Sequence, residues 1–394
     1  MKTRKHDVDT RVAHLGRDPR RYSGMVNTPV FRTSTVVFPD LESYSDRKSG
    51  GYKTVRYGRH GTPTTFAFEE AVAELEGAYN AVAVPNGLAA IAAVLLALTA
   101  RGGHLLVTDT VYAPARAFCE RRLRPAGIDI EYYDPRIGER IEGLIRENTI
   151  GVYCESPGSL TLELQDIPAI SAVVRGRGIP VVADNTWGTP YFFSPFACGV
   201  NISIHAATKY IAGHSDVMLG VVATDQAHWE PVRETVSDYG YAVSPDDCYL
   251  ALRGMRTMGV RLKQQMANAL EVARWLESRA EVERVIYPAL KSHPDHAIWQ
   301  RDFRGAASLF SFVLRESSRQ RVARFVDALE LFGIGSSWGG YESLITIAQP
   351  GRTATAWSSD GTLVRLHIGL ESPCDLVDDL AHGFDSMAGG DSGA

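Results

Sequence analysis

Residues 149–186 read "TIGVYCESPGSLTLELQDIPAISAVVRGRGIPVVADNT". Short apolar runs at 149–156 and 179–186 each predict a buried strand, and the segment 167–178 between them predicts a helix. Two parallel strands need a crossover connection, which is usually a helix. The stretch therefore predicts a parallel β-sheet with helices packed on its faces.

The same alternation extends in both directions from this stretch. Further strands are predicted at 81–84, 104–109, 128–134 and 201–208, and further helices at 64–80, 87–100 and 113–124. Strands that alternate with helices are typical of an α/β fold with a mostly parallel, doubly wound sheet. We expect residues 61–245 to form this large domain.

The two ends of the chain have different patterns. Residues 1–60 are rich in Arg, Gly, Ser and Thr and have weak periodicity, so they are predicted to form an extended arm. A long amphipathic helix begins near residue 245, and strand-like and helical segments follow it in mixed order. Residues 246–394 are therefore predicted to form a smaller C-terminal α+β domain.

Composition excludes several classes of partner. The formal net charge of −5 provides no basic excess for nucleic acid. The apolar run at 87–100 is shorter than the roughly 20 residues that cross a bilayer. The charged N-terminus lacks the apolar core of a secretory signal, so we expect a cytoplasmic protein. The histidine pair His293 and His296 has no carboxylate cluster beside it, which predicts a surface loop and no metal site.

One lysine has an unusual position. Lys209, in "HAATKYIAGHSD" (205–216), is the only lysine that follows a buried strand. A lysine at a strand end is usually a solvent-exposed residue. A desolvated lysine, however, can form a Schiff base with an aldehyde, and pyridoxal 5′-phosphate (PLP) is the commonest biological aldehyde held in this way. Lys209 is therefore a candidate attachment site for PLP if the other parts of such a site are present.

Candidates for those parts follow neighbouring strands. Asp184 could pair with the pyridinium nitrogen, although an aspartate before Asn is as often a turn residue. The N–H groups of Gly87 and Leu88 begin a helix and could hold the phosphate. Tyr112 could stack on the ring, although an aromatic residue there is more often part of a core. No G-x-G-x-x-G follows a predicted strand, so a dinucleotide site has little support.

Several longer motifs carry a family resemblance. They are "YGRHGTPT" (57–64), "ESPGSLTLELQDIPAI" (155–170), "VVADNTW" (181–187), "AATKYIAGHSD" (206–216), "YGYAVSPDDCYLALRGMRT" (239–257), "SWGGYESL" (337–344) and "RLHIGLE" (365–371). Through them the sequence resembles the Cys/Met-metabolism family of PLP-dependent enzymes, and most closely its β-lyase branch, over nearly the whole chain. The resemblance implies the PLP-dependent transferase fold type I, which is aspartate-aminotransferase-like.

The resemblance also implies roles for the cofactor-site residues. Lys209 would form the Schiff base with PLP, beside Asp184, Thr208, Gly87, Leu88 and Tyr112. Tyr57 and Arg59, on the arm formed by residues 1–60, would bind the phosphate held by a neighbouring subunit. This implies a homotetramer, a dimer of dimers, with active sites shared across subunits.

On the substrate side, the resemblance assigns Arg365 to the α-carboxylate, with Ser337 and Trp338 near it. Members that act at Cγ usually have leucine at the position of Trp338 and asparagine at that of Ser159. Both differences favour α,β-elimination of L-cystathionine to homocysteine, pyruvate and ammonia. Lys209, Tyr57 and Tyr112 are the expected catalytic residues.

The chain departs from the family pattern at Asn86, Asn201 and Ala206, which leaves the phosphate contacts and the substrate preference open. A γ-lyase, a γ-replacement synthase or a lyase for another cysteine S-conjugate fits the same motifs. From a different class, a non-catalytic PLP-binding regulator would retain the fold without turnover.

Overall fold

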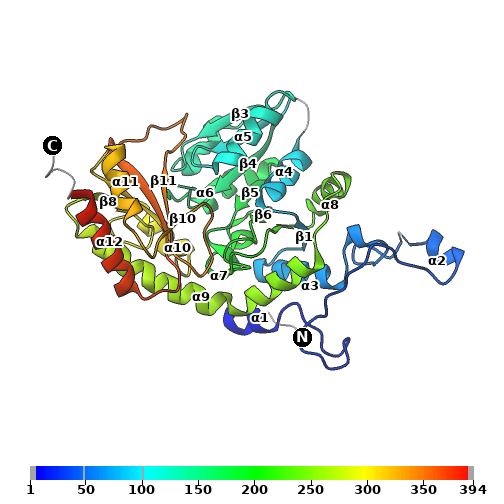
Figure 1. Ribbon diagram of the computed structural model, residues 1–394. Coiled ribbons are helices and arrows are strands. Elements are labelled where there is room, and N and C mark those ends of the chain that lie inside the picture. Colours follow the sequence, from blue (N-terminus) through cyan, green and yellow to red (C-terminus); the bar gives the residue numbers. More distant parts are fainter. Residues whose placement is uncertain (1–5, 48, 100–101, 389–394) are drawn as a thin grey trace.

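The computed structural model describes residues 6–47, 49–99 and 102–388, which form two β-sheets surrounded by helices (Figure 1). The larger sheet has seven strands in the order β1-β7-β6-β5-β4-β2-β3. These strands are β1 (Asn80–Val84), β2 (His104–Thr108), β3 (Asp129–Tyr133), β4 (Thr149–Glu155), β5 (Val181–Asp184), β6 (Ile202–His205) and β7 (Gly220–Thr224). All except β7 were predicted from the sequence.

The direction of β7 determines where Lys209 lies. Strands β3, β2, β4, β5 and β6 pair in parallel, which confirms the mostly parallel sheet. Strand β7 runs antiparallel to both β6 and β1. The chain therefore returns from β6 to β7 through a loop at 206–219, without a crossover helix, and Lys209 lies on that loop at the carboxyl edge of the sheet.

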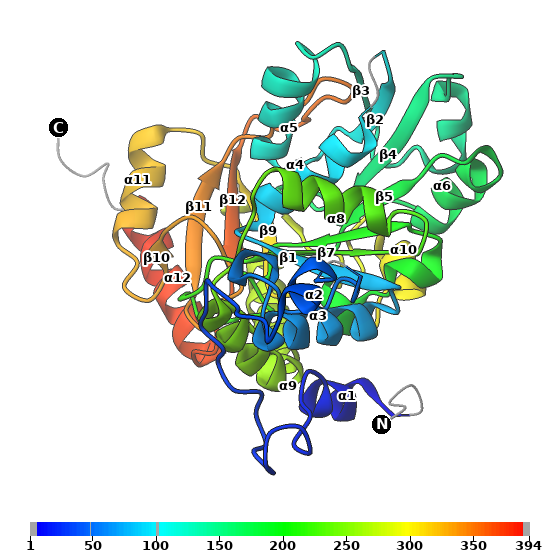
Figure 2. The same cartoon turned by 90° about the vertical axis from the view of Figure 1, so that its right-hand side faces the viewer.

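Helices cover both faces of this sheet (Figure 2). Alternate strand residues enter different cores: Val82 packs into the core that includes α4, while Ala81 and Ala83 pack into the core that includes α3 and α9. The helices of this part are α3 (Pro63–Glu76), α4 (Gly87–Leu98), α5 (Ala113–Phe118), α6 (Ile167–Val174), α7 (Thr189–Phe192) and α8 (Trp229–Asp238). Two separate cores on opposite faces are what a doubly wound fold requires.

The smaller sheet has five strands in the order β10-β11-β12-β9-β8. The long helix α9 (Pro245–Glu277) begins at the Ser244 cap and passes beneath both sheets in Figure 1. The remaining elements are β8 (Val282–Ile286), α10 (His296–Asp302), β9 (Leu309–Leu314), α11 (Arg319–Asp327), β10 (Gly333–Ile334), β11 (Leu344–Ala348), β12 (Thr362–His367) and α12 (Pro373–Ala388). The mixture of strands and helices agrees with a smaller α+β unit.

The N-terminal segment leaves the body of the molecule. Helix α1 (Val8–His14) packs on α9, whereas α2 (Leu41–Ser45) extends away from both sheets in Figure 1. In the segment that joins these two helices, the side chains of Met25, Val26 and Val37 are more than half exposed. An extended segment with exposed apolar residues fits an arm, and its contact with a neighbouring subunit remains a prediction.

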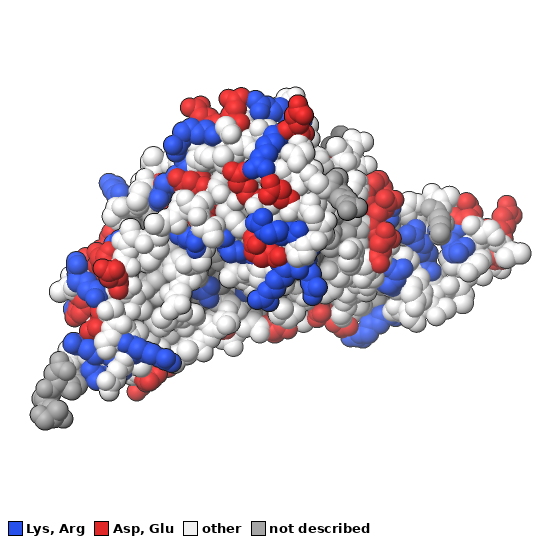
Figure 3. Space-filling view, turned by 90° about the horizontal axis from the view of Figure 1, so that it is seen from above, with Lys and Arg blue, Asp and Glu red and all other residues white. Residues whose placement is uncertain are grey.

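The face shown in Figure 3 carries acidic and basic residues side by side. Within the described ranges, no helix has the length and apolarity needed to cross a membrane.

The prediction of a surface loop at "SHPDH" was wrong for His293, which is only 3% exposed and accepts a hydrogen bond from the Asp295 N–H. Burial lowers the pKa of His293 to about 4, so the ring is neutral at pH 7.

Candidate active site

A cavity of about 450 Å³ opens at the carboxyl edge of the large sheet and is also lined by residues of the small one. In doubly wound folds ligands bind at this edge. The predicted site residues that line it are Gly87, Leu88, Tyr112, Ser159, Asp184, Thr208, Lys209, Ser337, Trp338 and Arg365.

Tyr57 and Arg59 are not among the residues that line this cavity. Tyr57 is 47% exposed, and Arg59 Nη1 donates to the Ser237 carbonyl at 2.9 Å. The structure thus separates both residues from Lys209 of the same chain. Their service to a neighbouring subunit's site remains a prediction.

Asp184 is held by the strand that precedes it. It is the last residue of β5, and its Oδ1 accepts hydrogen bonds from the Thr186 N–H at 3.0 Å and from Thr186 Oγ1 at 2.5 Å. Burial raises the pKa of Asp184, while these two hydrogen bonds and His205 oppose the rise by favouring the ionised form. A partly buried carboxylate at this position suits a cationic ligand atom.

Lys209 and Arg365 both contact Ser337. Lys209 Nζ donates to Ser337 Oγ at 2.5 Å, and Arg365 Nη2 donates to the Ser337 carbonyl at 3.4 Å. Ser337 has a φ of 82°, in the left-handed region that disfavours a side chain, and such strain is typical of functional sites. Burial, and secondarily the charge of Arg365, lowers the pKa of Lys209 to about 8.

Arg365 differs from the two other arginines of the cavity. Arg116 is paired with Asp109 at 2.7 Å, and Arg352 is paired with Glu163. Arg365 has no carboxylate partner among the residues that the structure describes. Its guanidinium is therefore the one that remains available for an anionic ligand group.

The start of α4 forms a narrow cradle. Gly87 and Leu88 are the first two residues of the helix, so their N–H groups have no intrahelical acceptor. A Cβ on Gly87 would lie only 2.6 Å from the Ala206 Cβ, which explains why glycine is needed here. Asn86 Oδ1 accepts from the Ala89 N–H at 2.9 Å and thereby caps the helix. An anion could approach the two free N–H groups closely.

Two other residues of the predicted site region have internal partners. Thr208 Oγ1 donates to the Leu219 carbonyl at 3.2 Å and accepts from the Leu219 N–H at 2.9 Å. Asn201 lies at the opposite end of the strands, where it bonds the Val181 N–H and Asp225. The departure from the family pattern at Asn201 is therefore structural and remote from the cavity.

Glu155 lines the cavity but was not singled out from the sequence. It ends β4, lies opposite Asp184 in the parallel register, and its Oε2 accepts from the Tyr112 N–H at 2.7 Å. Burial and the charge of Asp184 raise the pKa of Glu155 well above its ordinary value, which favours the protonated carboxyl. The pattern that identified Asp184, a carboxylate after an apolar strand, also applies to Glu155.

A protonated Glu155 predicts the behaviour of two variants. Glu155→Gln keeps an oxygen acceptor for Tyr112 and should change the Kd for PLP by less than about threefold. Glu155→Ala leaves the Tyr112 N–H without this acceptor and should weaken PLP binding by roughly tenfold or more. Titration of apoprotein with PLP, followed by absorbance, measures both. Equal losses in the two variants would mean that Glu155 acts as an anion.

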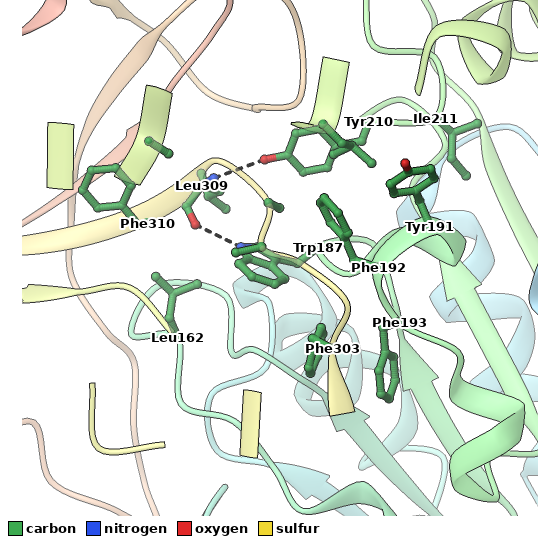
Figure 4. Close-up of a cluster of buried hydrophobic side chains, with 14 of the residues drawn as sticks. Leu162, Trp187, Tyr191, Phe192, Phe193, Tyr210, Ile211, Phe303, Leu309 and Phe310 are labelled. Carbon is green, nitrogen blue, oxygen red and sulfur yellow. Dashed lines mark hydrogen bonds between the residues drawn. The ribbon is translucent and has the colours of Figure 1, made fainter. Parts of the chain in front are cut away.

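The segments that follow Asp184 and Lys209 converge on one residue of the small sheet (Figure 4). Trp187 Nε1 donates to the Leu309 carbonyl at 2.9 Å, and the Leu309 N–H donates to the Tyr210 hydroxyl at 3.1 Å. The rings of Trp187 and Tyr210 belong to the same buried apolar cluster as Phe303 and Phe310. The two candidate cofactor residues are thus held at a fixed separation.

Comparison with known proteins identifies the family of the chain. The family described as "Cys/Met metabolism PLP-dependent enzyme" matches residues 9–385. The chain belongs to this family. Cystathionine beta-lyase MetC of Escherichia coli is 41% identical, over 96% of this chain and 98% of the relative. An L-alanine/L-glutamate racemase of Wolbachia pipientis is 38% identical, over 93% and 94% of the two chains.

The fold of this Cys/Met-metabolism enzyme agrees with a solved structure. The crystal structure of metB from Corynebacterium glutamicum superposes with a TM-score of 0.89 at 28% identity, over 98% of this chain and 100% of that chain. The PLP-dependent transferase fold type I is therefore confirmed.

The cavity fits the cofactor of the family. It provides an amine of lowered pKa on Lys209, a partly buried carboxylate on Asp184 and the narrow cradle at Gly87. These are the three groups that PLP needs for its aldehyde, its ring nitrogen and its phosphate.

Proposed function

We propose that this Cys/Met-metabolism enzyme is a carbon–sulfur lyase that cleaves L-cystathionine by α,β-elimination to homocysteine, pyruvate and ammonia. The observation that carries the proposal is the joint placement of Lys209 and the unpaired Arg365 around Ser337. The E. coli relative, named a cystathionine beta-lyase, supports the same substrate. Trp338 and Ser159, the two positions at which the resemblance favours β- over γ-elimination, both line the cavity.

Each residue of the chain has a separate task in this proposal. PLP, when bound, supplies the electron sink for the Cα–H bond that breaks. Arg365 binds the substrate carboxylate through its planar guanidinium and so orients Cα. Lys209, as a neutral amine, takes the proton from Cα and then gives a proton to the departing sulfur. Asp184 would pair with the positive ring nitrogen of the bound cofactor.

Product analysis tests the proposal. Purified protein incubated with L-cystathionine should release pyruvate and homocysteine. Release of α-ketobutyrate and cysteine would assign a γ-lyase instead. The racemase among the relatives adds a further outcome, in which a proton returns to Cα and no sulfur leaves; conversion of L-alanine to D-alanine without keto acid would show it.

The ionisation of Lys209 predicts a pH dependence. Only the neutral amine is a nucleophile, and the pKa of Lys209 is lowered to about 8 from 10.5. The rate of covalent PLP uptake by the apoprotein should therefore rise about tenfold per pH unit below pH 8 and level off above it. Stopped-flow absorbance measures this rate.

The same pH profile has an internal control. The positive charge of Arg365 contributes to the lowered pKa of Lys209, so Arg365→Gln should raise that pKa and move the plateau to higher pH. A profile that keeps rising to pH 10 in the unchanged protein would contradict the burial of Lys209.

Assembly and localisation also belong to the proposal. We propose a homotetramer in which the arm, with Tyr57 and Arg59, completes the site of a neighbouring subunit, and a cytoplasmic location. The exposed apolar residues of the arm support the first part. Light scattering on the purified protein tests it. Removal of residues 1–45 is expected to lower the number of subunits in the assembly.

A further inference from the structure

The part of the arm that carries Tyr57 and Arg59 is tied to the body of its own chain by a hydrogen bond to a buried carboxyl group. The Tyr52 hydroxyl donates to Glu69 Oε1 at 2.8 Å, and Glu69, on α3, is only 2% exposed. The same oxygen accepts from the Ala83 N–H at 2.9 Å. Ala83 lies on β1, the strand at one edge of the large sheet, where alternate N–H groups have no neighbouring strand. Glu69 therefore joins the arm to both a helix and the sheet.

The ring of Tyr52 is fixed as well as its hydroxyl. It meets Trp229 edge to face with the ring centroids 4.8 Å apart, and it lies 5.8 Å from the centroid of Phe66. Both partners are buried; Trp229 begins α8, and Phe66 belongs to α3. Aromatic pairs with such geometry add stability beyond the area that they bury. Tyr52 is thus held by α3 and α8 through its ring and by Glu69 through its hydroxyl.

The arm is also fixed at Gly61, on the far side of the turn at 57–60. Gly61 has a φ of 107°, and a Cβ added there would collide with the Phe66 ring, which Tyr52 also contacts. The cavity between this part of the arm and the body measures only about 40 Å³, and Tyr52, Arg59 and Glu69 all line it. The turn therefore lies between two fixed points of the same chain.

Building on the proposed homotetramer, we propose that Tyr52 is a positioning residue for the cofactor phosphate of the neighbouring subunit. It contacts neither cofactor nor substrate. Its bond to Glu69 holds the turn, so that the Tyr57 hydroxyl and the Arg59 guanidinium reach the phosphate in one geometry. Donors that are already ordered bind an anion more tightly than donors on a mobile loop, because less conformational freedom is lost on binding.

Two forms of the cofactor test this role. Tyr52→Phe keeps the ring contacts and removes only the hydroxyl, so the Kd for PLP should rise roughly two- to tenfold, the effect of one hydrogen bond. The Kd for pyridoxal, which lacks the phosphate, should be the same in this variant and in the unchanged protein. Tyr79→Phe, at a tyrosine that is 52% exposed, is the control and should leave both Kd values unchanged. Absorbance titration of the apoprotein measures all of them.

The outcomes separate the positioning role from the reaction. Equal losses of affinity for PLP and for pyridoxal would overturn the role, because Tyr52 would then support the site of its own chain as a whole. Unchanged affinity for both cofactors would overturn it too. Failure to release pyruvate from cystathionine would overturn the proposed reaction and leave these binding measurements standing, whereas a monomer in light scattering would remove the proposed assembly and the role of Tyr52 with it.

Mixed assemblies give an independent measurement, because the proposed role acts across subunits. Tyr52→Ala, which also removes the ring, should weaken PLP binding by roughly tenfold or more. When Tyr52→Ala and Lys209→Ala chains are co-expressed with different tags and purified together, only the Tyr52→Ala chains can form the Schiff base. Where such a chain is paired with a Lys209→Ala chain, the intact arm of the latter should serve its phosphate.

Part of the PLP trapped by borohydride in the mixed assembly should therefore titrate with the Kd of the unchanged protein. If all of it titrates with the Kd of the Tyr52→Ala protein, Tyr52 acts within its own chain and the proposal is wrong.

Discussion

Replacement of Lys209 by alanine should lower pyruvate release by roughly 10⁴-fold or more, because one amine provides both the covalent attachment and the proton transfers. The side chain is half-buried, and its Nζ donates a hydrogen bond to Ser337 Oγ. We therefore expect the melting temperature of the apoprotein to stay within a few degrees of the unchanged protein. Pyruvate assays and thermal melts measure the two quantities.

Two further measurements make this result specific. Lys291→Ala, in an exposed loop outside the cavity, should retain full activity. PLP should no longer be trapped on Lys209→Ala by borohydride, while the Lys291→Ala protein is labelled normally. Activity of Lys209→Ala near that of the unchanged protein would remove the basis of the proposed reaction.

Replacement of Arg365 by alanine should have the second largest effect. Two hydrogen bonds to a carboxylate are each worth about 1.5–3 kcal/mol, so kcat/KM for cystathionine should fall by roughly 10²- to 10⁴-fold. Most of the loss should appear in KM because the carboxylate is bound before and during the reaction. Steady-state kinetics with L-cystathionine measure this split.

The control for Arg365 uses both protein and ligand. Arg365→Lys keeps the charge but loses the planar fork, and it should recover only part of the affinity. Inhibition by an amine analogue without the α-carboxylate should be nearly equal in the unchanged protein and in Arg365→Ala. Equal losses for ligands with and without the carboxylate would show that Arg365 acts on the fold or on Lys209 instead.

The fold was predictable wherever the apolar runs were long and bounded. Strands β2 to β6 and helices α3, α4 and α9 lie where periodicity placed them, to within a few residues. Strand β7 was not predicted because its five residues begin with glycine, and β10 was not predicted because it has only two residues. Helix α12, with its apolar face spread over sixteen residues, was not recognised although the pattern was present.

Individual residues of the site were predictable from the sequence, but the ion pairing of its charged residues was not. Strand ends indicated Asp184, Tyr112 and Gly87, since carboxyl ends of parallel strands meet at one edge. The sequence could not show that Arg116 and Arg352 are neutralised, because their partners Asp109 and Glu163 are brought to them by tertiary packing. The same applies to the burial of His293, which was predicted to lie at the surface.

The double attachment at Leu309 limits how this molecule can move. Leu309 lies on β9, and Arg365 lies on the adjacent strand β12, paired with Ser311. A rotation of the small sheet against the large one would have to break both hydrogen bonds that the Leu309 backbone makes with Trp187 and Tyr210. We therefore expect substrate entry to depend on side chains and loops at the rim of the cavity more than on movement of one sheet against the other.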